Sequence, residues 1–321
     1  MLRAGVLRAG VLRAGALGLA GLLSVAGCSA SPVTAPPSGA APSSTSSAPG
    51  SVSALTPGAV RVSKLLVIVE ENHSLRRALS GMPYLASQAS RYGLATGYRA
   101  LTHPSLPNYL AIAGGSTFGV TDDAYPSAHR LIGASVFGQV LAAGGTAKTY
   151  AEAMSGNCQP VSTDSYAVKH NPWAYFIDER AACQRYDVPA GSPTAGALHS
   201  DVVHATLPTF GMLIPDVCND AHNCSLGTAD AYLRSWLPQI EAGPDFTSGR
   251  LAVVITFDEA EGGAGNHVLT VVVARQLHGV TVSVPLNHYS ITAAADSLVG
   301  AAPLREAAHA TNLLRAFGLT P

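Results

Sequence analysis

Carboxylate, amide and imidazole side chains follow directly after two short apolar segments of the sequence. Residues 65–69 (LLVIV) and 251–257 (LAVVITF) run into two polar groups, Glu70, Glu71, Asn72 and His73 after the first and Asp258 and Glu259 after the second. Carboxylates that gather in one place repel one another unless a cation lies between them. If the two segments end side by side, these groups predict a site for a hard divalent metal ion.

Both apolar segments are predicted to be β-strands that are buried on both faces. Each is too short to cross a membrane and is rich in Val and Ile, which is typical of strands in the middle of a parallel sheet. Open α/β sheets bind their ligands at the carboxyl ends of the strands, where these polar groups lie. For either segment alone, a strand followed by a solvated turn is the alternative.

A serine lies between two prolines in residues 102–110 (THPSLPNYL). Proline fixes φ and disfavours helical backbone in the residue before it, so we expect a helix to begin no earlier than Pro107. Ser105 would then lie in a rigid turn at a helix N-terminus, where free N–H groups favour an anion. It is a candidate nucleophile or anion-binding group, and an ordinary N-cap serine is the alternative.

Two further pairs of residues are candidates for the site. Lys169 and His170 place a cation beside a titratable base within an aromatic segment, which suits an anionic substrate. A surface loop with one packed Trp is the alternative for this segment. Asp220 and His222 follow a predicted strand and are close enough in sequence to share a site.

Four cysteines remain once Cys28 is set aside. In an exported protein an even number suggests two disulfides. Of the three possible pairings we prefer Cys158–Cys183 and Cys218–Cys224, because each would brace one polar loop. A Cys/His metal site is the alternative, although no CxxC spacing is present.

The N-terminal part of the chain differs in composition from the rest. Residues 1–27 contain arginines followed by an apolar core, and they are predicted to be an export signal. Cys28 comes next, as in a bacterial lipoprotein motif. A plain cleaved signal is the alternative. Residues 28–59 are mostly Ser, Pro, Ala, Thr and Gly and predict a disordered tether. Residues 60–321 should form the catalytic domain of a protein that is lipid-anchored to the outer face of the cell membrane, or secreted.

The charge of the chain limits its partners. The formal net charge is −1 and charged residues make up 12% of the chain, so no basic field is available for nucleic acid or an anionic membrane surface. No segment after residue 30 is long enough to cross a bilayer. We expect a monomer that binds a small substrate and meets a membrane only through its N-terminal lipid anchor.

Strands and helices are predicted to alternate along the whole domain. Further strands are expected over residues 97–101, 146–151, 208–214 and 269–273, and helices over residues 82–91, 136–143, 228–240, 290–300 and 308–317. This period predicts an α/β fold, a three-layer αβα sandwich with a mostly parallel central sheet.

These motifs, in this order, resemble the phosphoesterase family of the alkaline phosphatase superfamily, which holds bacterial secreted acid phosphatases and phosphocholine-type phospholipases C. The matching segments are EENHS (70–74), THPSLPNYLAIAGG (102–115), YAVKHNPWAYF (166–176), LPTFGMLIPDVCNDAHNCS (207–225), LAVVITFDEAEGGAGNH (251–267) and NHYSI (287–291). They extend over essentially the whole domain.

The resemblance implies a role for each candidate residue. The implied metal ligands are Glu71, Asn72, Ser105, Asp258 and Glu259, with Ser105 also the nucleophile. The implied catalytic groups beside it are Asp220, His222 and His288. Substrate would be bound by Asn108, Lys169 and His170, with His103 and His267 as weaker candidates. The ion would be Mg²⁺, Ca²⁺, Mn²⁺, Fe or Zn²⁺, and an oxygen-rich set disfavours a purely zinc-type site.

The implied activity is that of a metal-dependent acid phosphatase. The metal lowers the pKa of Ser105, the serine attacks phosphorus, and a histidine protonates the leaving alcohol, which favours acidic pH. A phospholipase C or phosphodiesterase with the same groups is the first alternative. A lipoprotein that binds a ligand without turnover is the second.

Overall fold

The two acidic strand ends lie side by side in the middle of one sheet. The computed structural model describes residues 61–262 and 264–321, and the predicted signal, Cys28 and the tether up to residue 59 lie outside them. Strands β1 (Lys64–Glu70) and β6 (Leu251–Phe257) are parallel neighbours, with Glu70 opposite Phe257. Their apolar side chains are buried on both faces, as the uninterrupted Val and Ile runs predict.

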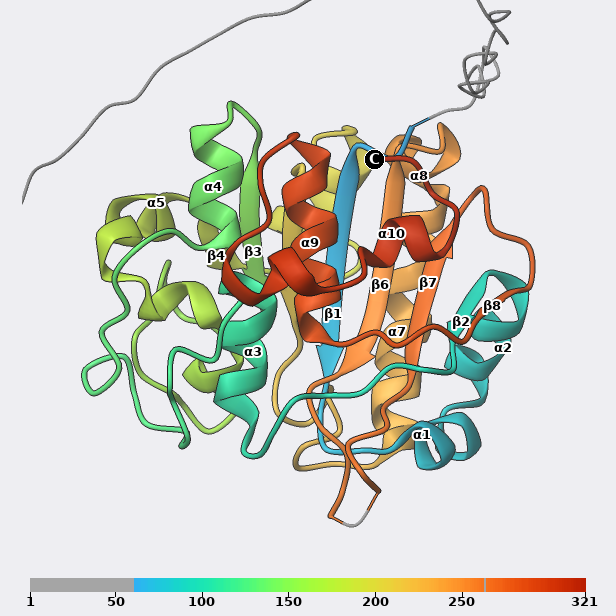
Figure 1. Ribbon diagram of the computed structural model, residues 1–321, viewed down its shortest axis with the longest axis horizontal. Coiled ribbons are helices and arrows are strands. Elements are labelled where there is room, and N and C mark those ends of the chain that lie inside the picture. The colour runs from blue at the N-terminus through green and yellow to red at the C-terminus, as the bar shows by residue number, and fades with distance from the viewer. Residues whose placement is uncertain (1–60, 263) are drawn as a thin grey trace, which may run out of the picture. The chain divides into compact units, whose positions relative to one another are not determined.

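The central sheet has eight strands in the order β4-β3-β5-β1-β6-β7-β2-β8 (Figure 1). The outer strands are β2 (Gly93–Ala95), β3 (Ala147–Ala151), β4 (Asp187–Pro189), β5 (Phe210–Ile214), β7 (Thr270–Ala274) and β8 (Val280–Val282). Among the described strands only β7 runs against the others, because it returns directly from β6. The prediction of a mostly parallel sheet is confirmed.

Helices cover both faces of the sheet, which confirms the three-layer sandwich. In Figure 1 one group lies in front of the sheet and α7 lies behind it. The front group is α3 (Ser105–Gly114), α4 (Val136–Ala142), α9 (His288–Leu298) and α10 (Leu313–Ala316). Helices α1 (Leu75–Gly81), α2 (Pro83–Arg91), α6 (Ala197–Val203) and α8 (Pro244–Thr247) contact α7 (Leu226–Ala242). No helix in the described part of the chain is long and apolar enough to cross a membrane.

The segment around Lys169 is packed into the domain and is not a surface loop. It consists of short 3₁₀ turns, Val168–His170, Pro172–Tyr175 and Ile177–Glu179, that lead into α5 (Arg180–Tyr186). The ring of Trp173 stacks on Phe137 with centroids 4.3 Å apart, and its Nε1 donates to Glu179 at 2.8 Å. Burial of the aromatic side chains therefore fixes the place of Lys169 and His170.

Three local predictions are wrong. The second strand is Gly93–Ala95 and not residues 97–101, where only Tyr98 and Arg99 form isolated bridges. The first position of β2 needs glycine, since a Cβ on Gly93 would lie 2.7 Å from the ring of Phe317. Helix α3 begins at Ser105, because Pro107 falls in the first turn, where a missing N–H is tolerated. The last predicted helix is split into a 3₁₀ turn (Arg305–His309) and α10, which Asn312 caps.

Both preferred disulfides, Cys158–Cys183 and Cys218–Cys224, are formed. The first lies against Asp187, the fully buried first residue of β4. Nδ2 of Asn171, the residue after His170, donates to both carboxylate oxygens of Asp187 at 3.0 and 2.8 Å. Burial nevertheless raises the pKa of Asp187 from 3.8 to about 7.

We expect Asp187→Asn to gain stability relative to the wild type as the pH rises. The unfolded chain loses the Asp187 proton near pH 4, whereas the folded protein holds it to about pH 7. Folding therefore takes up a proton in this window, and the contribution of Asp187 to stability falls as pH rises through it. From pH 5 to pH 8 the unfolding free energy of the variant should rise by about 2–3 kcal/mol relative to that of the wild type.

Urea unfolding of both proteins at the two pH values measures this difference. Asp164→Asn is a matched control because Asp164 is exposed, and its difference from the wild type should not change with pH. A pH-independent difference for Asp187→Asn would show that Asp187 is ionised in the folded protein.

Candidate active site

The carboxylate of Glu71, directly after β1, is the centre of the site. It is fully buried. Its Oε1 accepts from the Tyr109 hydroxyl at 2.8 Å, and its Oε2 accepts from the Ser105 hydroxyl at 3.1 Å. Asn72 Nδ2 also donates to Oε2 at 2.9 Å. The strand end and helix α3 thus bring together the predicted nucleophile and a predicted metal ligand.

A second buried carboxylate, Asp258, lies beside Glu71. Its Oδ1 accepts from the backbone N–H of Asn72 at 2.9 Å, and the backbone of Asn72 is left-handed (φ 60°). Burial raises the pKa of Glu71 well above 4.5, and the charge of Asp258 raises it further. Burial and Glu259 raise the pKa of Asp258 to about 8. Two neighbouring buried carboxylates repel each other when both are ionised. A cation between them would remove this repulsion, so the pair suits a metal ion.

His170 lies between two of the carboxylates. Its Nε2 is 3.1 Å from Glu71 Oε1, its Nδ1 is 3.0 Å from Asp220 Oδ2, and its ring stacks on Tyr109. The contact angles do not suit hydrogen bonds, so both ring nitrogens and Asp220 Oδ2 lack hydrogen-bond partners in residues 61–262 and 264–321. Burial lowers the pKa of His170 well below 6.5, and the ring is therefore neutral.

The residues at this position can hold a metal ion. Ligand atoms of Glu71, His170 and His222 all lie within 4.8 Å of one another. A neutral buried imidazole without hydrogen-bond partners is a suitable ligand, and Asp258 Oδ2 is likewise buried without a partner in the described chain. His222 is exposed, and its Nδ1 lies 2.8 Å from Asn223 Oδ1. Glu71 and His170 are the buried members of this cluster, and Asp258, which lies outside it, is a further candidate ligand.

Ser105 is the first residue of α3, and its side chain is buried at 2% exposure. Pro104 holds the N-cap position, so the alternative of an ordinary N-cap serine is wrong. Lys169 Nζ lies 3.4 Å from Ser105 Oγ and 3.4 Å from His222 Nε2. The hydroxyl therefore has a carboxylate on one side and a cation on the other.

Asp123 is a residue of the site that sequence reasoning missed. Its Oδ1 accepts from the backbone N–H of Leu106 at 2.9 Å, and its Oδ2 accepts from Lys169 Nζ at 2.9 Å. Burial lowers the pKa of Lys169, but the charges of Glu71 and Asp123 outweigh it and the net shift is upward. Lys169 is therefore a cation. Asp123 lies in a polar loop without periodic spacing, so no sequence pattern indicated it.

Asn108 and Glu259 support the turn before Ser105. Asn108 Oδ1 accepts from the backbone N–H groups of Leu101 and Thr102 at 3.1 and 3.3 Å. Its Nδ2 donates to Thr102 O at 2.9 Å and to Glu259 Oε2 at 3.4 Å. Glu259 Oε1 lies 3.1 Å from His103 Nδ1. These contacts hold the turn, and the implied roles of Asn108 in oxyanion binding and Glu259 in metal binding stay predictions.

His288 lies behind the site. Its Nε2 is 2.7 Å from the backbone oxygen of Asp258, and its Nδ1 is 3.0 Å from the Tyr98 hydroxyl. Burial lowers its pKa to about 4. With both nitrogens engaged, His288 is placed to position Asp258, and its implied catalytic role stays a prediction.

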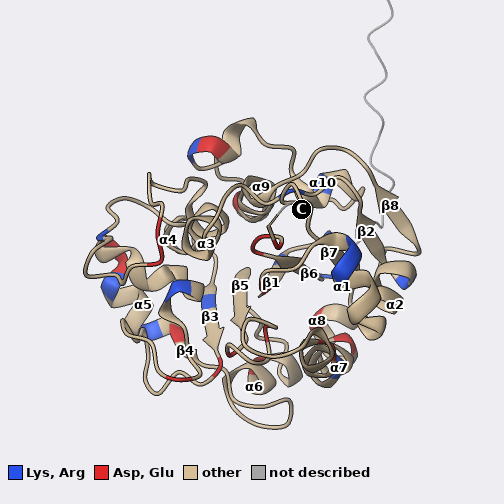
Figure 2. Cartoon of the chain, turned by 90° about the horizontal axis from the view of Figure 1, so that it is seen from below, with Lys and Arg blue, Asp and Glu red and all other residues tan. Residues whose placement is uncertain are grey.

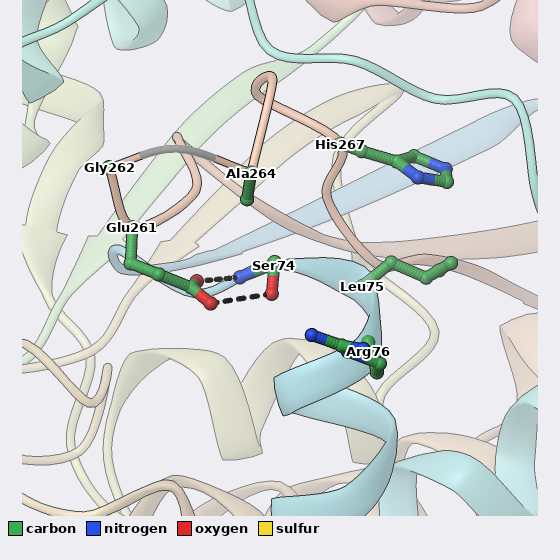
Figure 3. Close-up of a pocket in the computed structure, with 7 residues that line it drawn as sticks. All are labelled: Ser74, Leu75, Arg76, Glu261, Gly262, Ala264 and His267. Carbon is green, nitrogen blue, oxygen red and sulfur yellow. Dashed lines mark hydrogen bonds between the residues drawn. The ribbon is translucent and has the colours of Figure 1, made fainter.

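A pocket lies next to the strand ends. Figure 2 looks onto the carboxyl ends of β1 and β6 and shows acidic segments near the centre of the view. Figure 3 shows a pocket of about 350 Å³ beside them, in which Glu261 accepts from the hydroxyl of Ser74 at 2.7 Å. His267 lines this pocket and contacts Thr96 O at 2.8 Å through Nε2. Among the described residues, the His267 side chain contacts none of the groups around Ser105.

Comparisons with known proteins identify relatives of this chain. A family model described as the phosphoesterase family matches residues 76–296. Phosphatidylinositol-3-phosphatase of Mycobacterium tuberculosis is 29% identical over 252 residues, which are 77% of this chain and 79% of that protein. Phosphate-repressible acid phosphatase of Penicillium chrysogenum is 31% identical over 236 residues, 69% of this chain and 55% of that protein. The chain thus spans little more than half of the fungal relative.

Solved structures support the fold. A protein in the alkaline phosphatase superfamily from Vibrio parahaemolyticus has a TM-score of 0.52 at 10% identity, over 75% of this chain and 67% of its own. A protein of glycosaminoglycan metabolism from Bacteroides thetaiotaomicron has a TM-score of 0.56 at 11% identity, over 82% of this chain and 83% of its own. At such identity the likeness shows an alkaline phosphatase-like fold and nothing about substrates.

Proposed function

We propose, on the premise that this chain belongs to the phosphoesterase family, that it is a metal-dependent phosphatase of phosphate monoesters that works through a phosphoserine. Hydrolysis of phosphoric esters is the chemistry of its family and of its relatives. One observation carries the finer proposal: the Ser105 hydroxyl donates to Glu71 at 3.1 Å and lies 3.4 Å from Lys169 Nζ. That arrangement suits an activated nucleophile beside an anion-binding cation.

Glu71, His170 and Asp258 would hold the metal ion. Once bound, the ion would lower the pKa of the serine hydroxyl and offset the charge of the phosphoryl oxygens. The hydrogen bond to Glu71 orients the hydroxyl, and Lys169 neutralises phosphoryl charge that develops beside it. Tyr109 fixes Glu71 from the other side at 2.8 Å.

The reaction has two displacements. Ser105 Oγ gives its proton to the Glu71 carboxylate and forms a bond to phosphorus as the bond from phosphorus to the alcohol oxygen breaks. His222, which is exposed and faces Lys169 at 3.4 Å, donates a proton to that leaving oxygen. Water then attacks the phosphoserine and gives a proton back to His222. Glu71 returns the other proton to Ser105 Oγ as the bond from phosphorus to that oxygen breaks and phosphate leaves.

The names of the relatives favour a monoester substrate over a diester. They are named a phosphatidylinositol phosphatase and acid phosphatases, and each such substrate presents a terminal phosphoryl group. We expect the full chain to hydrolyse p-nitrophenyl phosphate with a kcat/KM at least about 100-fold above that for bis-p-nitrophenyl phosphate, a difference of about 3 kcal/mol. The reverse order would support a phosphodiesterase.

Short-chain phosphatidylinositol 3-phosphate in the same assay tests the lipid monoester. Faster hydrolysis of this lipid than of p-nitrophenyl phosphate would indicate recognition of the headgroup. Equal or slower hydrolysis would indicate a general acid phosphatase.

We also propose that the protein is exported and anchored through Cys28. Two disulfides in the described domain support an oxidising compartment, and the lipoprotein motif supports the anchor. Detergent phase partitioning of the wild type and Cys28→Ala checks it. The wild type should enter the detergent phase and the variant the aqueous phase, whereas equal partitioning would exclude acylation at Cys28.

A further inference from the structure

Asp123 holds two of the donors that surround the nucleophile. Its Oδ1 accepts from the N–H of Leu106, the residue after Ser105, and its Oδ2 accepts from Lys169 Nζ, both at 2.9 Å. Lys169 Nζ is in turn 3.4 Å from Ser105 Oγ. The carboxylate of Asp123 therefore bonds both to the first turn of α3 and to Lys169, the cation beside Ser105.

The same donors suit a phosphoryl group on its way to Ser105. A phosphorus atom that bonds to Ser105 Oγ carries its free oxygens next to that atom, within the reach of Lys169 and the N-terminal amides of α3. Charge-assisted hydrogen bonds from N–H groups and lysine are the usual contacts of phosphate oxygens. Asp123 presents two negatively charged oxygens to these donors, as a phosphoryl group would.

Both anions cannot occupy these donors together. The single N–H of Leu106 is directed at Asp123 Oδ1. Repulsion between a phosphoryl group and the carboxylate of Asp123 would be strong at such short distances.

We propose that Asp123 is a built-in competitor of the substrate, whose carboxylate occupies the phosphoryl subsite of the resting enzyme and leaves when a phosphate ester or phosphate binds. This rests on the proposed function of the same site. The Asp123 side chain can turn towards solvent, since 31% of it is already exposed and its neighbours Thr121 and Asp122 are exposed. Such a competitor weakens the binding of product phosphate more than it slows the chemical step, because it must leave before either ligand can enter.

The alternative is that Asp123 stays in place and orients Lys169 during turnover, which would make it a positioning residue. The two roles predict opposite effects on phosphate binding. If Asp123 competes, removing its charge strengthens the binding of phosphate. If it positions Lys169, removing its charge weakens that binding and lowers kcat.

The experiment compares Asp123→Asn with Asp122→Asn in the full chain. The two variants make the same change in charge and shape at adjacent residues, and Asp122 contacts His129 and the Ala124 N–H, away from Ser105. Isothermal titration calorimetry with inorganic phosphate, at fixed ionic strength and divalent metal concentration, gives the dissociation constants. Inhibition of p-nitrophenyl phosphate hydrolysis by phosphate gives the inhibition constants.

We expect Asp123→Asn to lower the dissociation constant and the inhibition constant of phosphate by roughly tenfold. KM should fall with them, while kcat changes less. Asp122→Asn should match the wild type. An unchanged or higher dissociation constant in Asp123→Asn would overturn the proposal, as would failure of both the wild type and the variant to bind phosphate.

A second variant covers a failure to fold, which circular dichroism would reveal. Asp123→Ala removes both acceptor oxygens and should tighten phosphate binding in the same direction. The binding measurement is also independent of turnover. A wild type that binds phosphate but hydrolyses no ester would contradict the proposed function, and the comparison of the variants would still decide the role of Asp123.

Discussion

Replacing Ser105 by alanine should lower kcat for phosphate monoesters by at least about 10³-fold, or about 4 kcal/mol of transition-state stabilisation. In the proposed mechanism the hydroxyl forms the bond to phosphorus, and no neighbouring oxygen could take its place without rebuilding the turn. Its removal leaves Lys169, the α3 amides and the carboxylates in position. Phosphate binding should therefore persist while turnover is lost.

Steady-state hydrolysis of p-nitrophenyl phosphate measures this effect. Ser90→Ala is the matched control, because Ser90 is an exposed helical serine whose hydroxyl bonds only to the Ala86 carbonyl among the described residues. Its kcat should equal that of the wild type. Acid quenching with a ³²P-labelled substrate should trap label on the wild type and none on Ser105→Ala. Full activity in Ser105→Ala would assign the nucleophile to another group, such as a water molecule.

Removing the metal, or replacing Glu71 by glutamine, should lower activity by about 100-fold or more. Glu71 is the buried carboxylate shared by the nucleophile, Tyr109 and His170. Glutamine keeps the size of the side chain but removes the charge that would bind a cation. Chelation by EDTA followed by readdition of divalent ions should abolish and then restore the activity of the wild type alone.

Thermal unfolding gives a second measure of the same site. Without metal, burial and the charge of Asp258 penalise ionised Glu71, so metal-free Glu71→Gln should unfold at the same temperature as the metal-free wild type, or higher. Added metal should raise the Tm of the wild type and leave that of the variant almost unchanged. Glu306→Gln, at an exposed 3₁₀ turn, is the control and should behave as the wild type. An equal response of all three proteins would place the metal elsewhere.

The strand ends were predictable from sequence because burial leaves a strong signal there. A fully buried strand must be apolar throughout, so the abrupt change at Glu70 and at Asp258 marks both the strand end and the ligand-binding edge. Prolines around Ser105 gave a similar signal for the turn, although the helix begins earlier than expected. These patterns depend on local chemistry, which a sequence shows directly.

Other parts of the site depend on contacts that the sequence does not encode locally. Tyr109 has the spacing of a core residue in an apolar helix, yet its hydroxyl binds Glu71. Asp123 lies in a polar loop and reaches the nucleophile only through the folded chain. Strand β2 was missed because its Gly-Leu-Ala sequence has little intrinsic preference for a strand. In each case the tertiary environment decides the role.

The position of β1 in the middle of the sheet has a consequence for the order in which the enzyme can be assembled. The first strand to leave the ribosome pairs on one edge with β5 (Phe210–Ile214) and on the other with β6 (Leu251–Phe257). Until most of the domain has been synthesised, both edges of an apolar strand stay unpaired and prone to aggregation. Glu71 likewise acquires Asp258 only when β6 docks, so we expect nascent and C-terminally truncated chains to be inactive and to depend on chaperones. The catalytic site can form only after most of the domain has been synthesised, so this topology would suit the export before folding that we propose.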